Sequence, residues 1–163
     1  MTKFKLLLFI AVLAGFPALA HAGFDKGVAA YDRGDYAKAY KEFKPLAEQG
    51  DIVAQFYLGV MYDFGRGVSQ DYIQAMKWYR KAAEQGDDEA QFELGWAYAD
   101  GNSVPQDFIQ AYLWFYLAGA HGDDTYAEDY AEDFRNSLAG KMTPAQIAEA
   151  QRLARKWKPK GKD

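Results

Sequence analysis

The sequence predicts an all-α protein, a right-handed α-solenoid of helix-turn-helix repeats that ends in a C-terminal pair of capping helices. Three observations support this fold class. A segment recurs at an interval of 36 residues, apolar residues in each unit follow the spacing of an amphipathic helix, and Asp and Gly residues stand where helices begin and end. The chain has 163 residues, 50% of them hydrophobic, which is enough for one domain with its own core.

The repeat is most visible in the pentapeptide AEQGD, which occurs at 47–51 and again at 83–87. Aligning the chain on itself at 36 residues requires no gap. Matched positions hold the same or a similar residue: Ala54, Leu58, Gly59, Tyr62, Gly65, Asp71, Ala75, Trp78 and Tyr79 in one unit become Ala90, Leu94, Gly95, Tyr98, Gly101, Asp107, Ala111, Trp114 and Phe115 in the next. A fixed period of this size indicates a repeat architecture.

Each unit is predicted to form two helices. In the first helix, Ala54, Leu58 and Tyr62 recur every four residues and form one apolar stripe. Asp71 and Asp107 are predicted N-caps of the second helix, and Gly86 and Gly122 stand where a helix ends in a left-handed residue. The predicted repeats cover about 24–51, 52–87 and 88–123.

The first unit is shorter than the others. Its first helix is predicted at roughly 25–32, with a turn through Arg33 and Gly34. Pro45 falls inside its second helix, where it removes one backbone hydrogen bond. We expect that helix to bend at Pro45 without breaking.

Two further helices follow the repeats and are suited to cover the open end of a solenoid. One lies in the stretch YAEDYAED at 126–133 and ends by Gly140, and the other begins at a capping box, Thr143 to Gln146, with Pro at its first helical position. We predict a solenoid with its first cap helix at 23–140, a capping helix at 141–158 and a basic tail at 159–163 that is solvated and frayed.

Residues 1–22 are predicted to be a secretory signal peptide. Lys3 and Lys5 precede an apolar run, and the small residues around His21 offer a cleavage site after Ala22. We therefore expect an exported protein, periplasmic or secreted, with no membrane span after cleavage. An uncleaved membrane anchor is the alternative.

The unit from Ala54 to Gly86 carries a recognisable pattern. Read directly, it is A-x3-L-G-x2-Y-x2-G-x-G-V-x2-D-x3-A-x2-W-Y-x2-A-A-x2-G, which resembles the Sel-one-like repeat (SLR), a relative of the tetratricopeptide repeat. The third unit departs from it at Ser103, Phe115 and Gly119, and the resemblance covers about 24–123. It implies a tetratricopeptide-like superhelix whose members generally act as adaptors, and it implies no reaction.

The composition argues against several classes of function. The chain has no Cys, and outside the predicted signal peptide His121 is its one His, which leaves little for metal ligation or a Ser-His-acid triad. Residues 23–140 hold 10 Lys or Arg and 21 Asp or Glu, a net charge of −11, which disfavours nucleic acid. We predict no cofactor, no metal and no catalytic residues, and a protein that is not an enzyme.

Two alternatives stay open beside an adaptor of the bacterial cell envelope. The resemblance keeps a cell-wall or β-lactam-directed enzyme in view, although no S-x-x-K or other nucleophile–base motif is present. A secreted factor that contacts a host protein would use the same surface chemistry as an envelope adaptor. The acidic residues between Asp123 and Asp133 suggest either a solvated face or a site for a cation or basic partner.

The candidate binding face is the concave side, which the first helix of each pair lines in tetratricopeptide-like solenoids. With Leu58 and Gly59 as the packing reference, aromatic and acidic residues are expected to face a partner there. The predicted partner is another protein or peptide, basic or extended. For Phe56, Phe92 and Trp96, packing between helices is the alternative. The predicted contact residues are Phe56, Val60, Asp63, Phe64, Glu89, Phe92, Trp96 and Asp100.

Overall fold

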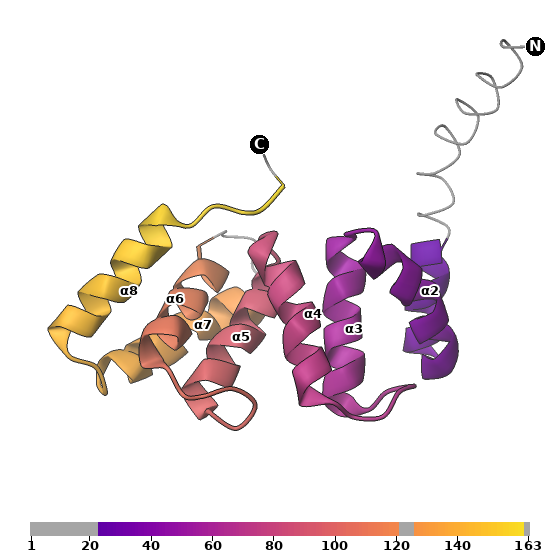
Figure 1. The fold of residues 1–163 in the computed structure, drawn as a ribbon, viewed down its shortest axis with the longest axis horizontal. Coiled ribbons are helices and arrows are strands. Elements are labelled where there is room, and N and C mark those ends of the chain that lie inside the picture. The colour runs from indigo at the N-terminus through magenta and orange to yellow at the C-terminus, as the bar shows by residue number, and fades with distance from the viewer. Residues whose placement is uncertain (1–22, 121–125, 162–163) are drawn as a thin grey trace, which may run out of the picture.

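The structure is a computed structural model that describes residues 23–120 and 126–161, and every regular element in these two stretches is a helix (Figure 1). The all-α solenoid predicted from the sequence is confirmed. Residues 23–32 form the first described helix. It is followed by α2 (Tyr36–Glu48), α3 (Ile52–Phe64), α4 (Tyr72–Glu84), α5 (Asp88–Asp100), α6 (Phe108–Ala118), α7 (Tyr126–Ala139) and α8 (Pro144–Lys156).

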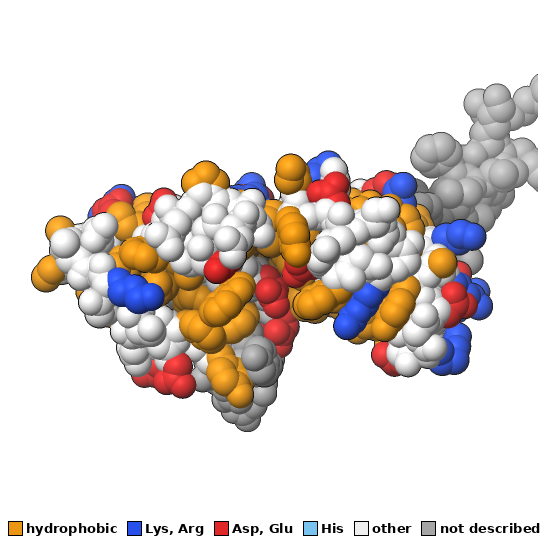
Figure 2. Space-filling model, turned by 90° about the horizontal axis from the view of Figure 1, so that it is seen from below, with side chains coloured by type: hydrophobic (Ala, Val, Ile, Leu, Met, Phe, Trp, Pro, Cys, Tyr) orange, Lys and Arg blue, Asp and Glu red, His pale blue; other side chains and the backbone are white. Residues whose placement is uncertain are grey.

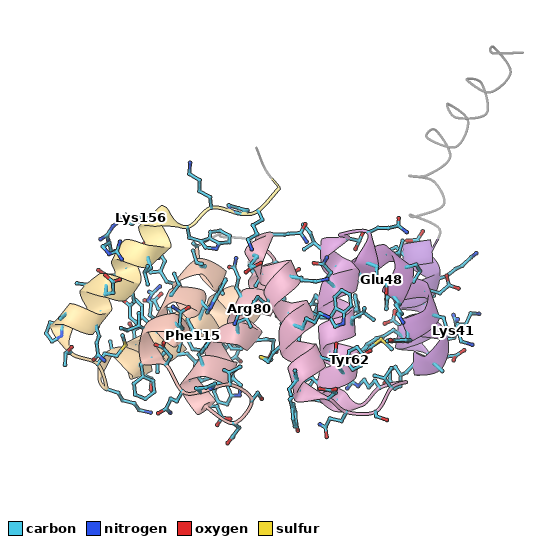
Figure 3. All side chains as sticks on the ribbon, in the orientation of Figure 1. Lys41, Glu48, Tyr62, Arg80, Phe115 and Lys156 are labelled. Carbon is cyan, nitrogen blue, oxygen red and sulfur yellow. The ribbon has the colours of Figure 1, made fainter. Side chains whose placement is uncertain are left out.

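The helices pack mainly against their neighbours in the sequence, which gives an elongated row rather than a single rounded core (Figure 1). Residues 23–32 pair with α2, α3 with α4, and α5 with α6. Both α7 and α8 pack on α6 and cover the end of the row, as predicted for capping helices. Side chains fill the spaces between the helices, with Phe115 in the interior and Lys41 and Lys156 exposed near opposite ends (Figure 3).

The AEQGD segments form the junctions between successive hairpins. Gly50 and Gly86 have φ of +101° and +98°, a left-handed conformation that Gly adopts without steric cost. The following Asp51 and Asp87 each accept a backbone N–H bond of 2.8 Å and cap the next helix. Asp71 and Asp107 cap α4 and α6 in the same way, so the predicted caps are confirmed.

A buried glutamine completes each junction. The side-chain amide of Gln55 donates to the carbonyl oxygen of Ala47 at 3.0 Å, and that of Gln91 donates to Ala83 at 3.1 Å. These carbonyls belong to the last turn of a helix and also accept the backbone N–H of Gly50 and Gly86. Each glutamine therefore adds a second, buried hydrogen bond that ties the following helix to the end of the preceding one.

Two glycines let the helices of a hairpin approach closely. A Cβ added at Gly59 would lie 2.4 Å from the ring of Tyr79, and one added at Gly95 would lie 2.8 Å from the ring of Phe115. Both rings are fully buried. The absence of a side chain at these positions sets how closely α3 meets α4 and α5 meets α6.

The first unit has the two helices and the intervening turn that the sequence predicts. Residues 23–32 are helical, Gly34 turns the chain with φ of +77°, and α2 runs through Pro45 without a break. Pro45 lacks only its own backbone N–H bond to the carbonyl of Lys41, four residues earlier, while its carbonyl still accepts the Gln49 backbone N–H at 3.2 Å. Phe43 anchors this unit and is fully buried.

The C-terminal tail is not the solvated, frayed segment that the sequence predicts. After α8 the chain returns toward the middle of the molecule (Figure 1), where the Lys160 backbone N–H donates to the carbonyl oxygen of Glu84 at 2.7 Å. The Lys160 ammonium also lies 2.6 Å from the Glu84 carboxylate. Pro159 and Trp157 lie over Gly86. The end of α4 offers unpaired carbonyls and an acidic side chain, and these hold the tail.

None of the described helices combines the length and apolar composition that crossing a bilayer requires. The predicted signal peptide, residues 1–22, lies outside the described residues, as do His121 and Gly122.

Replacing Gly59 by Ala should lower the free energy of unfolding by about 1–3 kcal/mol, because the added methyl group overlaps a fully buried ring. Urea unfolding followed by circular dichroism measures this. Gly119→Ala is the control, because its Cβ would meet its nearest neighbour at 3.5 Å and Ala83 already holds the equivalent place one repeat earlier. Equal stability of the two variants would contradict the close approach.

Removing residues 157–163 should lower the free energy of unfolding by about 1–2 kcal/mol, mainly because the partly buried Trp157 is lost from the core. Lys160→Ala should cost less than about 0.5 kcal/mol, because the ammonium is largely exposed. Both values come from urea unfolding. A truncated protein as stable as the full chain would show that the tail contributes nothing to the fold.

Candidate functional site

A cavity of about 490 Å³ opens between the second and third hairpins, and we name it the interhairpin cleft. Its walls come from four parts of the chain: the C-terminal end of α3, the first half of α4, one face of α5 and the turn that follows α5. Seen from below, acidic side chains cross the middle of this hollowed face with hydrophobic side chains on both sides (Figure 2). The cleft is lined by Asp63, Phe64, Tyr72, Met76, Glu93, Trp96, Ala97, Asp100, Asn102 and Ser103.

Four of the eight predicted contact residues line this cleft: Asp63, Phe64, Trp96 and Asp100. Phe64 is 62% exposed and Trp96 is 47% exposed, which is unusual for aromatic side chains in a domain of this kind. Both depart from the repeat, since the positions 36 residues away hold Asp100 and Val60.

The other four predicted residues lie elsewhere. Phe92 is only 7% exposed and packs against Phe115 and Phe134, so the prediction that it faces a partner is wrong and the alternative of packing between helices holds. Phe56 and Val60 are partly buried against core residues of α4, α5 and α6. Glu89, in the first turn of α5, is half-buried outside the cleft. The repeated AQF explains the error, because its Phe serves the hairpin packing in both units.

Sequence reasoning missed three lining residues of chemical interest. Tyr72 and Met76 come from α4, the second helix of its pair, which was not expected to contribute. Glu93 lies one helical turn before Trp96 and replaces Tyr57 of the preceding unit. Glu93 could have been identified from the sequence, because it differs from the residue at the matching position of the preceding unit and lies close to Trp96, which also differs.

Burial raises the pKa values of two carboxylates in the cleft. The pKa of Glu93 rises to about 7, mainly through burial and further through the charges of Asp63 and Glu89. Burial also raises the pKa of Asp63, although the Tyr79 hydroxyl donates to this carboxylate at 3.3 Å and opposes the rise. Within residues 23–120 and 126–161, neither these two nor Asp100 belongs to an ion pair. The cleft therefore holds negative charge that no described cation neutralises.

Neighbouring groups fix the two exposed aromatic rings. The indole of Trp96 meets the edge of the Phe134 ring at 5.1 Å between centroids and 80° between planes. The guanidinium of Arg66 lies 5.0 Å from the centroid of Phe64 and also donates to the hydroxyl of Tyr31. These contacts hold both aromatic rings in place in the unbound protein.

A second hollow of about 300 Å³ lies on the other side of Trp96, and we name it the Phe134 pocket. It shares Trp96 and Asp100 with the cleft. Its remaining lining residues are Ala99, Phe134, Ser137, Leu138 and Lys141, three of which are apolar.

The structure offers no obvious metal centre in the part of the chain that it describes, where no three His, Cys, Asp or Glu side chains converge, the cleft carboxylates included. The acidic stretch from Asp123 to Asp133 is only partly described. Within it, Glu132 lies 4.0 Å from Arg135, and His121, Asp123 and Asp124 fall outside the described residues. The cleft can accept a cationic side chain between aromatic walls, and that is its clearest chemical capacity.

The comparisons with known proteins agree with this architecture. The family model described as Sel1 repeat matches residues 52–87 and 88–123, which are the second and third units. No match was found among curated proteins.

Two of the solved structures that are similar to this chain carry this repeat. One is c5321 of Escherichia coli, described as a protective antigen of uropathogenic strains with an SLR fold, with a TM-score of 0.76 and 33% identity. The match covers 85% of this chain but 29% of that longer protein. The other is a Sel1 repeat protein from Oxalobacter formigenes, with a TM-score of 0.57 and 31% identity over 75% of this chain and 93% of that one. With this identity along nearly a whole Sel1 repeat protein, and two units matched by the model, the chain belongs to the Sel1 repeat family.

Proposed function

We propose that this protein is a protein-interaction adaptor of the bacterial cell envelope, and that it binds a basic, extended segment of a partner in the interhairpin cleft. Sel1 repeat proteins generally mediate protein–protein interaction, which supports the general class of function. The site, the basic partner and the envelope location are our proposal.

One observation carries the proposed site. The cleft combines three carboxylates, each outside the described ion pairs, with two aromatic side chains that stay exposed on a rigid scaffold. A half-buried carboxylate without a counter-charge is unfavourable, as the raised pKa of Glu93 indicates. A Lys or Arg side chain would supply that counter-charge, and the rings would cover its apolar stem.

Export is supported by two observations. Residues 1–22 have the layout of a secretory signal peptide. One structural relative is described as a protective antigen of uropathogenic Escherichia coli, which agrees with a protein that leaves the cytoplasm.

Trp96→Ala should reduce recovery of the partner at least tenfold, because an exposed aromatic wall between charged groups is a typical binding hot spot. The measurement is quantitative mass spectrometry after cross-linking and affinity purification from cell-envelope extracts of the native bacterium. Asp63→Asn combined with Asp100→Asn should reduce recovery of the same protein, and recovery from wild type should fall as salt rises.

Ile73→Ala is the matched control for these variants. It removes another exposed apolar side chain, 77% exposed, which lies beside the cleft residue Tyr72 in sequence but does not line the cleft. A partner recovered equally by wild type, Trp96→Ala and the doubly neutralised variant would show that the cleft is not the binding site.

Glu93→Gln should raise the free energy of unfolding by about 1–2 kcal/mol at pH 8 and change it little near pH 4. The pKa of Glu93, about 7 in the folded protein, exceeds its ordinary 4.5, so folding favours the protonated form and stability falls as the pH rises between these values. Besides burial, the charges of Asp63 on α3 and Glu89 on α5 raise the pKa of Glu93. From α4, the Tyr79 side chain also interacts with Glu93, whereas the Arg80 guanidinium donates a hydrogen bond to the Tyr98 hydroxyl.

Urea unfolding of both proteins from pH 4 to pH 8 tests this expectation. Glu48→Gln, which changes an exposed carboxylate at the end of α2, is the control and should follow wild type at every pH. Curves for Glu93→Gln and wild type that stay parallel across this range would show that Glu93 titrates normally.

A further inference from the structure

The interhairpin cleft and the Phe134 pocket adjoin each other at Trp96. Both hollows are lined by Trp96 and by Asp100. The T-shaped contact with Phe134 holds the indole in place, so it forms a fixed wall between them. A ligand that crosses this wall meets two different environments in succession.

The two environments differ in chemistry. On the cleft side lie Asp63 and Glu93, which together with the shared Asp100 favour a cationic group. On the other side lie Phe134 and Leu138, which favour an apolar group. Lys141, at the Phe134 pocket, disfavours a second cation there.

The separation suits neighbouring side chains on one face of an extended chain. In such a chain, side chains at i and i+2 point to the same face, about 6.5 Å apart. Because the Trp96 indole lines both hollows, the side chain at i can enter one hollow and the side chain at i+2 can enter the other. Residue i+1 then points away from the protein.

We propose that the two hollows together form one groove that recognises a two-residue motif in an extended partner segment: Lys or Arg in the interhairpin cleft, and an apolar residue two positions away in the Phe134 pocket. This inference rests on the proposed function, since it specifies the segment that the same cleft binds. It adds a second subsite, contributed by α7, which lies outside the matched repeats.

The test is selection of binders from a display library of random dodecapeptides on the immobilised full-length protein. Among sequences selected by wild type, we expect pairs with Lys or Arg at one position and Leu, Ile, Met or Phe two positions away to be at least tenfold enriched over the unselected library. Synthetic fluorescein-labelled versions of the strongest binder should lose at least tenfold in affinity by fluorescence polarisation when either residue becomes Ala.

Variants separate the two subsites. Glu93→Gln should weaken the preference for the basic residue and keep the apolar one. Ser137→Phe should fill the Phe134 pocket from an exposed position, abolishing the apolar preference and keeping the basic one. Asn136→Phe is the matched control, because Asn136 is an exposed neighbour on α7 that does not line the pocket, and it should select the same motif as wild type.

The outcomes distinguish this inference from the proposed function. A basic preference that depends on Glu93 and Trp96, without an apolar residue at the second position, would overturn the two-residue motif and leave the cleft as the binding site. Selection that ignores both Glu93 and Trp96, or that yields no basic preference, would overturn both.

Discussion

The close contact between a glycine backbone and an aromatic ring inside each hairpin is the constraint on which the rest of this structure depends. Gly59 receives the ring of Tyr79 and Gly95 receives that of Phe115. The first contact also serves the site, because it places the Tyr79 hydroxyl where it donates to Asp63. In the next unit the equivalent positions are Phe115 and Ala99, so the hydroxyl and the carboxylate are both absent. Packing and site chemistry therefore change together from one repeat to the next.

The proposed binding groove is lined by residues at which the repeats differ, within an otherwise regular repeat structure. Leu58, Leu94, Trp78 and Trp114 keep the frame and are buried. At two other positions the units differ, since Glu93 replaces Tyr57 and Trp96 replaces Val60. A repeat fixes where side chains project, and adjacent units can carry different side chains there while the hairpin is kept. The proposed binding site is thus formed by residues at which adjacent units differ.

Most of the fold could be predicted because each element carries its own local signal. The Asp caps, the left-handed Gly86 and the capping box at Thr143 depend on neighbouring residues alone, and the structure confirms them. The site was harder, because it depends on contacts between elements. Phe92 was misplaced, since the sequence cannot show which face of α5 meets Phe115. The contribution of α4 and the docking of the tail at Glu84 involve residues far apart in the chain, which periodicity does not relate.

The returning tail gives this repeat protein a contact of a kind that solenoids usually lack. In a simple array each unit touches only its neighbours, and units can open one at a time from an end. Here the segment after α8 is bonded to the end of α4, 76 residues earlier in the chain. The last helix cannot leave without also breaking the contacts of the tail with Glu84 and Gly86, at the junction between the second and third hairpins. The C-terminal half should therefore unfold as one cooperative unit, and this unit includes Trp96.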